Sequence, residues 1–414
     1  MQKTKIVCKL LLFLVILGSL TGCWDREELE DNAYVIALGI DRSKQEGKIK
    51  VTMLIANPEV GTVQGGGGSR ESPRTVVTFD ANDFLTAKGT ANSIVSRDIS
   101  YDLLKTFVIS EEFAKDPNFL STIYDASKDR EIRHDSYLAV SKEKASDYLL
   151  NNKPKMETRP HKFFQFMIDH SIENGFVPDS TLFRFLKTVE RGTDLFLAMY
   201  TSAEKEKNPE IKGEDEYLAG QLHASGELND TQFIGSAVFK NGVMIDKLTG
   251  QETRIVNILD NTTDIDEILV NIPDPFSDKQ QQLAVRILKT ENTKVKMNVK
   301  GEKPKITITI PLKIQVMTNP SMVNFSTKKN QQILKKQIIK DTKSLSEELL
   351  RKSQTELKGS PYPLSTYARK YFGTIQEYEK FNWVKSFPEA DIIVQPEIEI
   401  VDYKQVKKPK KMGD

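Results

Sequence analysis

The sequence predicts a mixed α+β (α/β) multidomain protein with two unlike halves. Between residues 33 and 150, short apolar strand candidates alternate with helix candidates, which is typical of a layered α/β or α+β region. Between residues 267 and 316, four strand candidates follow one another, which indicates an antiparallel meander sheet. A long amphipathic helix candidate then spans 328–358. We expect this helix to cover the meander sheet and bury its apolar stripe.

The strands of the N-terminal half are expected where β-branched and aromatic residues cluster between turn residues. The expected strands are 33–40, 49–56, 74–79, 106–109 and 136–140. The expected helices are 84–93, 111–126 and 142–150. Asp83 should cap the first helix, because its short side chain can accept a hydrogen bond from the first turn.

Aromatic residues are densest between residues 160 and 200. Phe163, Phe166, Met167 and His170 recur at helical spacing, and we interpret this face as packed core. A second short helix should begin at residues 179–181.

The C-terminal half begins with a hairpin signal. Asn241-Gly242 separates two strand candidates, and both residue types tolerate the positive φ angles that a tight turn requires. The remaining expected strands are 232–239, 243–246, 267–272, 281–290, 294–299, 305–316 and 391–401. The expected helices are 249–260, 328–358, 364–371 and 374–386. In the longest helix, the stripe consists of Leu334, Ile338, Leu345 and Leu349.

The N-terminus has the pattern of a lipoprotein signal peptide. Three lysines precede an apolar stretch from Leu10 to Leu17, which is far shorter than the ~20 residues that cross a bilayer. Leu20-Thr21-Gly22-Cys23 then forms a lipobox, in which the cysteine thiol takes the lipid and becomes the first residue. Cys23 is therefore the expected lipidation site, and residues 1–22 are expected to be cleaved.

Composition changes suggest the domain boundaries. We expect an N-terminal α/β region at 23–201, either as one domain or as two, 23–150 and 151–201. A charged linker at 202–216 should precede a C-terminal domain at 217–403. The tail at 404–414 is basic and is interpreted either as a solvated end or as a contact with anionic lipid headgroups.

Charge and cysteine content exclude several classes of protein. The first 22 residues contain three lysines and no acid, so the mature chain has 56 basic and 58 acidic side chains. This balance argues against a nucleic-acid-binding protein. Only Cys8 and Cys23 are present, so no cysteine remains for a disulfide, a nucleophile or a thiolate metal site in the mature chain.

No catalytic or cofactor motif is found. A Gly-x-Ser-x-Gly elbow, a His-Glu-x-x-His pair, a nucleotide-binding lysine loop and an Asp-rich calcium loop are all missing from the sequence. The four histidines, His134, His161, His170 and His223, do not have the spacing of a metal site. We therefore predict a non-enzymatic protein with no catalytic residue, no metal site and no cofactor.

Two motifs resemble a known family. Residues 22–31, Gly-Cys-Trp-Asp-Arg-Glu-Glu-Leu-Glu-Asp, followed by Ala-Leu-Gly-Ile-Asp at 37–41, resemble the opening of the Ger(x)C family. Gly-Ser-Ala-Val-Phe-Lys at 235–240, with Gly242 and residues 248–252, is similar to the start of that family's C-terminal half. One segment departs from the pattern that often follows the long helix in this family: it reads Lys-Gly-Ser-Pro-Tyr-Pro at 358–363.

The resemblance implies a function. Ger(x)C proteins are lipoprotein C subunits of spore nutrient germinant receptors, held on the outer leaflet of the spore inner membrane. They act with two multi-pass membrane subunits, one of which is similar to amino-acid transporters. The alternatives are an extracytoplasmic solute-binding lipoprotein of a transporter and, third, an anchored hydrolase. Small-molecule binding stays open at this point.

Overall fold

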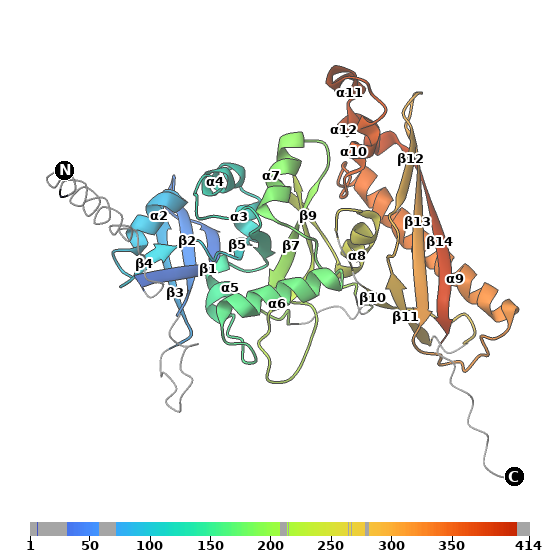
Figure 1. Ribbon diagram of the computed structural model, residues 1–414, viewed down its shortest axis with the longest axis horizontal. Coiled ribbons are helices and arrows are strands. Elements are labelled where there is room, and N and C mark those ends of the chain that lie inside the picture. The colour runs from blue at the N-terminus through green and yellow to red at the C-terminus, as the bar shows by residue number, and fades with distance from the viewer. Residues whose placement is uncertain are drawn as a thin grey trace, which may run out of the picture.

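Two β-sheets lie beside each other along the long axis of the protein, as the computed structural model shows (Figure 1). The structure describes residue 6 and residues 31–57, 72–207, 213, 215–263, 265, 267–277 and 281–403. The predicted signal peptide (apart from residue 6), the lipidation site Cys23 and the basic tail 404–414 lie outside these ranges.

Fourteen strands are found in the described residues. Those of the first sheet are β1 (Asn32–Arg42), β2 (Ile49–Ala56), β3 (Arg74–Ala81), β4 (Asp98–Ser100), β5 (Thr106–Ser110), β6 (Tyr137–Ser141), β7 (Phe196–Ser202), β8 (Gln232–Lys240) and β9 (Val243–Leu248). Those of the second sheet are β10 (Ile268–Pro273), β11 (Gln282–Leu288), β12 (Lys294–Asn298), β13 (Lys305–Val316) and β14 (Asp391–Tyr403).

Helices flank both sheets. Those of the first part are α2 (Phe84–Ala91), α3 (Glu111–Ala114), α4 (Phe119–Ala126), α5 (Ala145–Asn151), α6 (Pro160–Glu173) and α7 (Leu182–Arg191). Those of the second part are α8 (Gly250–Leu259), α9 (Lys328–Thr355), α10 (Leu364–Arg369), α11 (Ile375–Phe381), α12 (Trp383–Ser386) and the 3₁₀ turn η3 (Phe387–Glu389).

The first sheet is covered on both faces. Its strand order is β3-β2-β1-β5-β6-β7-β8-β9, with β4 paired to the start of β1. The four strands from β1 to β7 in this order run parallel, and the flanking pairs run antiparallel. Helices α2, α3, α4 and α7 bury their apolar residues on one face, and α5 and α6 bury theirs on the other. Coverage of both faces explains why every residue of β5 and β7 is buried.

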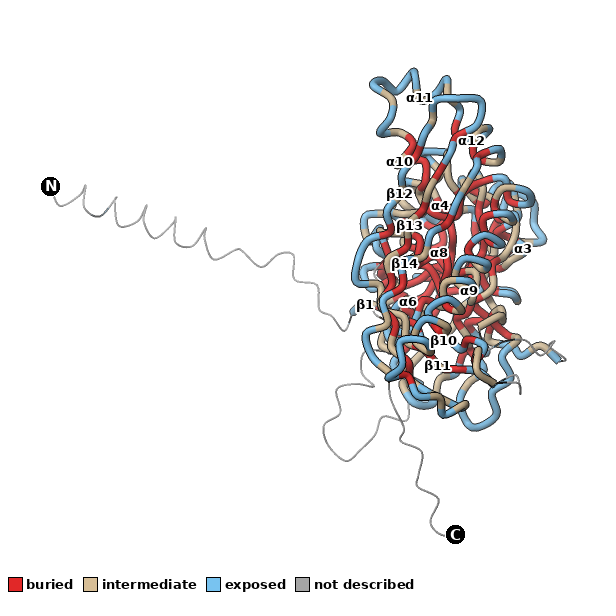
Figure 2. The backbone as a smooth tube through the Cα atoms, turned by 90° about the vertical axis from the view of Figure 1, so that its right-hand side faces the viewer, coloured by how far each residue is buried: buried red, intermediate tan, exposed pale blue. Residues whose placement is uncertain are grey.

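The second sheet is covered mainly on one face. Along β13, buried and partly exposed residues alternate strictly, and the buried set faces α9. Helix α9 buries Leu334, Ile338 and Leu349 against this sheet, as the apolar stripe predicted, whereas the fourth stripe residue, Leu345, is only partly buried. The side of α9 that faces away from the sheet is exposed (Figure 2). The strand after α9, β14, runs parallel to β13, whereas the other pairs of this sheet are antiparallel.

The predicted fold class is confirmed: alternating strands and helices form the N-terminal part, and a mainly antiparallel sheet with a long helix forms the C-terminal part. The Asp83 cap is also confirmed, because its carboxylate accepts a hydrogen bond from the amide of Thr86 at 2.8 Å. The hairpin at Asn241-Gly242 is present, with φ angles of 51° and 81°.

Three expectations need correction. The hairpin β8–β9, expected at the start of the C-terminal half, belongs to the first sheet, because β8 pairs with β7. The helix expected at 111–126 is two helices, since Pro117 between them cannot donate a backbone hydrogen bond. On α6, the buried residues are Pro160, Phe163, Phe164 and Ile168, whereas Phe166 and His170 are exposed and stack on each other.

Candidate functional site at the junction of the two sheets

Strands β7 and β8 contribute to the cores of both halves. In β7, Phe196 and Tyr200 point into the core of the first part, whereas Leu197 points into the core of the second. In β8, Phe239 packs in the core of the first part, whereas Val238 packs in the core of the second. The two parts of the molecule are therefore joined by shared strands rather than by a free linker.

Helix α8 lies at this junction and is buried almost all round. Its start is fixed by a capping box, in which Thr249 and Glu252 each accept a hydrogen bond from the other's backbone amide. The guanidinium of Arg254 lies 3.9 Å from the centre of the Phe176 ring and forms an ion pair with Asp215 at 3.1 Å. This packing couples α8 to the segment after α6.

The segment that follows α9 lies against the start of β7. The amide of Leu195 donates to the carbonyl of Ser360 at 2.8 Å, and Ser365 donates its amide and its hydroxyl to the carboxylate of Asp194. A side chain at position 359 would place its Cβ 2.9 Å from the Leu195 side chain, so the approach requires glycine there. Burial raises the pKa of the Asp194 carboxyl to about 7.

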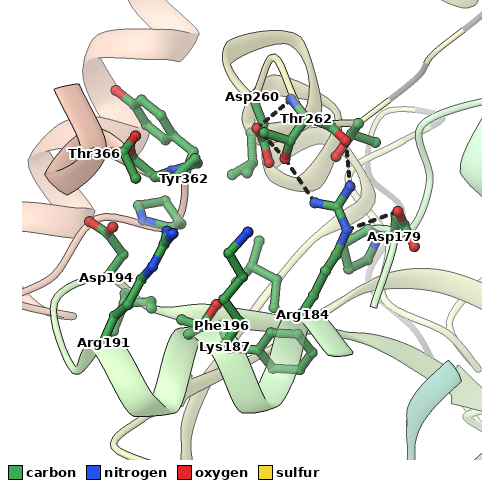
Figure 3. A pocket seen from close by; sticks show the side chains of 18 of the residues that line it. Asp179, Arg184, Lys187, Arg191, Asp194, Phe196, Asp260, Thr262, Tyr362 and Thr366 are labelled. Carbon is green, nitrogen blue, oxygen red and sulfur yellow. Dashed lines mark hydrogen bonds and ion pairs between the residues drawn. The ribbon is translucent and has the colours of Figure 1, made fainter. Parts of the chain in front are cut away.

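A cavity of about 480 Å³ opens at this contact. Its walls are α7, the start of β7, the end of α8 and residues 361–366. Arg184, Lys187 and Arg191 extend from α7 toward the space, and Tyr362 and Thr366 lie on its opposite side (Figure 3).

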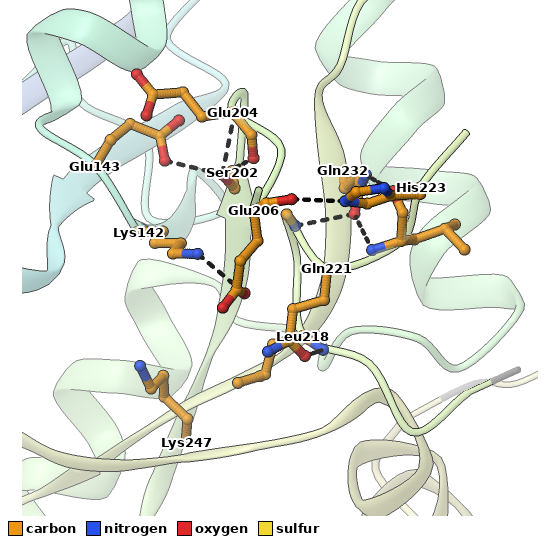
Figure 4. Close-up of polar contacts among 12 residues, drawn as sticks. Lys142, Glu143, Ser202, Glu204, Glu206, Leu218, Gln221, His223, Gln232 and Lys247 are labelled. Carbon is orange, nitrogen blue, oxygen red and sulfur yellow. Dashed lines mark hydrogen bonds and ion pairs between the residues drawn. The ribbon is translucent and has the colours of Figure 1, made fainter. Parts of the chain in front are cut away.

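The start of the predicted linker is also bonded to the first sheet (Figure 4). The carboxylate of Glu143 accepts a hydrogen bond from the Ser202 hydroxyl at 2.9 Å, and burial raises the pKa of Glu143. Lys142 forms an ion pair with Glu206 at 3.3 Å, and Nε2 of His223 lies 2.6 Å from the Glu206 carbonyl oxygen. The division into domains at 202–216 nevertheless remains a prediction.

Sequence reasoning named one site residue, Cys23, which lies outside the described residues. Among the residues that the structure describes, no group of three or more His, Cys, Asp or Glu side chains could hold a metal ion. His161 and His170 lie on α6, whereas His134 and His223 lie in separate loops. The expected lack of a catalytic centre, a metal and a cofactor stays a prediction.

The sequence did not predict the cavity. Its walls come from residues about 180 positions apart, and no local pattern marks that proximity. The available signal was the basic spacing at 184, 187 and 191, which places three cations on one helix face.

Comparison with known proteins identifies the family. The Spore germination protein N-terminal domain matches residues 25–202, and the domain described as Spore germination B3/GerAC like, C-terminal, matches residues 234–404. The chain belongs to the GerAC family of spore germination proteins. Together the two matches span most of the chain, and the resemblance to the Ger(x)C family is confirmed.

Individual relatives agree with this family. The chain is 26% identical to the putative spore germination protein YfkR of Bacillus subtilis (strain 168) over 412 residues, which is 97% of each chain. It is 22% identical to spore germination protein B3 of the same organism over 414 residues, covering 98% of this chain and 100% of that one. Spore germination protein KC is 31% identical over 143 residues, 34% of each chain.

A solved structure supports the same GerAC fold. The crystal structure of the GerBC protein superposes with a TM-score of 0.54 at 18% identity, covering 91% of this chain and 100% of that chain. Among the described residues, no helix has the length and apolar character needed to cross a membrane.

Proposed function

We propose that this GerAC-family chain is a non-enzymatic, lipid-anchored subunit of a membrane-bound germinant receptor. Its role in spore germination follows from the family, whose two domains match residues 25–202 and 234–404. This observation carries the proposal, and the lipobox that ends at Cys23 supports the anchor.

In this proposal, a diacylglyceryl group on Cys23 holds the chain on the outer face of the spore inner membrane. In the sequence, Cys23 lies only a few residues before Asn32, where β1 begins. The chain acts by protein–protein contact with two multi-pass membrane subunits of the same receptor, one of them transporter-like, and thereby helps nutrients to trigger germination. Strands β7 and β8, which contribute to both cores, suit such a scaffold, because they join its two parts without a separate linker.

A solute-binding lipoprotein of a transporter is the second candidate. The cavity of about 480 Å³ between the two parts favours it, because ligand pockets often form between domains. The unlike architecture of the two sheets disfavours it, since two similar doubly wound lobes would be expected for that class.

Metabolic labelling with an alkyne fatty acid tests the anchor. We expect label on the wild-type protein and none on Cys23→Ala, because the thiol of Cys23 is the proposed attachment site. Cys8→Ala is the matched control, since Cys8 lies in the expected signal peptide. Equal labelling of Cys23→Ala and wild type would contradict the proposal.

A further inference from the structure

The cavity at the junction is not used by the proposed function, and its charge distribution points to a ligand. Arg184, Lys187 and Arg191 lie three and four residues apart on α7, so they share one helix face. Their side chains reach from this face into the cavity (Figure 3). Three cations therefore border one concave space.

One of the three cations is already neutralised. Arg184 forms an ion pair with Asp179 at 2.9 Å and donates to the hydroxyl of Thr262 at 2.8 Å and to its carbonyl. These contacts hold the guanidinium in place and leave it little capacity to bind another anion.

In the described part of the chain, the other two cations form no ion pair of this kind, although Arg191 interacts electrostatically with the carboxyl of Asp194. Among the described residues, neither Lys187 nor Arg191 has a carboxylate within 4.0 Å, and the nearest specific contact of the Lys187 ammonium is the Phe183 ring at 5.4 Å. Both side chains are exposed. They remain available to an anion that enters the cavity.

Besides Asp179, which pairs with Arg184, the cavity wall has two acids, Asp194 and Asp260, and both accept hydrogen bonds from neutral donors. The carboxylate of Asp260 accepts hydrogen bonds from the amide and the hydroxyl of Thr262, both at 2.8 Å. The carboxyl of Asp194 accepts from Ser365, and burial raises its pKa to about 7. Neither acid lies within 4.0 Å of Lys187 or Arg191, and Asp194 is partly protonated near pH 7 because its pKa is raised, so the wall compensates these two cations only in part.

We propose that this cavity binds a small anion with a carboxylate or phosphate group, held by Lys187 and Arg191. A guanidinium can bind either group through two parallel hydrogen bonds, and an ammonium adds a compact charge. A volume of about 480 Å³ lies within the usual range for small-molecule pockets. The wall also supplies hydroxyl groups and an apolar floor, from Thr188, Thr263, Thr366, Leu195, Leu197 and Val256.

Such a ligand would connect the two parts of the molecule. Helix α7 packs on the first sheet, whereas α8 and residues 361–366 belong to the second core. An anion bound between them stabilises the folded arrangement by an amount that rises with the logarithm of its free concentration above the dissociation constant, because it binds the folded state only. The inference does not depend on the lipid anchor or on receptor partners.

Calorimetric titration and thermal unfolding of the full chain in detergent test this proposal with two probes, inorganic phosphate and succinate. Sodium chloride at equal ionic strength is the reference. We expect saturable binding and a higher melting temperature with at least one probe. Lys187→Ala and Arg191→Gln should each weaken binding about tenfold, the effect of losing one charge-assisted hydrogen bond.

The matched control removes the same charge elsewhere. Lys335→Ala and Lys336→Ala change exposed cations on α9 and should leave the binding constant unchanged. Binding of only one probe supports the proposal and identifies the acid group. If both probes act no more than chloride, or if the α9 variants weaken binding equally, the proposal is wrong. Fatty-acid labelling of Cys23 is independent of all these outcomes.

Discussion

The two sheets differ in how they bury their strands. In the first sheet, helices cover both faces, and β5 and β7 have no exposed residue. In the second, α9 covers one face, and β13 alternates between buried and partly exposed positions. The inner strands β5 and β7 therefore have no position that tolerates a polar side chain, whereas every second position of β13 does.

The largest difference is expected at the aromatic cluster of the first sheet. Phe119 lies 5.7 Å from Phe185 and 5.4 Å from Phe239, measured between ring centres, and it is fully buried. We expect Phe119→Ala to lower the free energy of unfolding by about 3–5 kcal/mol, because it leaves a cavity. Urea denaturation measures this loss.

The comparison variant lies on the outer face of the second sheet. Thr307→Ala on β13 changes a partly exposed side chain and should cost less than about 0.5 kcal/mol. Similar losses for the two variants would contradict the difference between the sheets.

A smaller loss is expected at the junction of the sheets. Gly235 in β8 has φ = 92°, and a Cβ there would lie 2.6 Å from the carbonyl oxygen of Leu248. Gly235→Ala should therefore lower the free energy of unfolding by about 1–3 kcal/mol or more. Gly47→Ala is the matched variant, since Gly47 has φ = 73° and open space around its Cβ position. Equal losses in denaturation experiments would show that the close approach at Gly235 costs nothing.

The pH dependence of stability tests the contact between Asp194 and Ser365. Because burial raises the pKa of Asp194 from 3.8 to about 7, the folded state holds this proton more tightly than the unfolded state. The contribution of Asp194 to the free energy of unfolding should therefore fall as pH rises from about 4 to about 7. Asp194→Asn should remove this pH-dependent contribution to the free energy of unfolding. Denaturation curves of the wild-type and variant chains at several pH values measure the difference. An unchanged pH profile would contradict the burial of a titrating carboxyl.

A small effect is expected at an ion pair that joins α9 to α8. Lys352 lies 2.8 Å from Glu252, and both side chains are mostly buried. A double-mutant cycle should give a coupling energy of about 0.5–1 kcal/mol. The exposed pair of Lys343 and Glu347 on α9, at 3.7 Å, should couple by no more than about 0.5 kcal/mol. A larger coupling in the exposed pair would reverse the expectation.

The spacing of apolar residues in the sequence predicted correctly a strand and a helix that each bury only one face. The alternation at 305–316 and the stripe of Leu334, Ile338 and Leu349 both report directly on burial, and both are confirmed. No strand was predicted at 196–202, because a short apolar run that is buried on both faces has no period.

That missing strand explains the hairpin error. Without β7, the hairpin at 232–248 had no visible partner in the N-terminal half, so it was assigned to the C-terminal half. The parallel direction of β14 was also not predicted. It depends on the end of the sheet at which the chain enters β14 after α9, and the sequence of these elements does not show that end.

The candidate site was less predictable than the fold. It unites α7, α8 and residues 361–366, which meet only through tertiary packing. Besides the basic spacing on α7, the departure from the family pattern at 358–363 was a local indication, because this segment lies against Leu195.

Affinity capture of the tagged chain from detergent-solubilised membranes tests the proposed function most directly. The account predicts that two multi-pass membrane proteins co-purify with the wild-type chain, and that Cys23→Ala lowers their yield. Recovery with an ATP-driven permease instead would contradict the receptor-subunit proposal and favour a solute-binding lipoprotein.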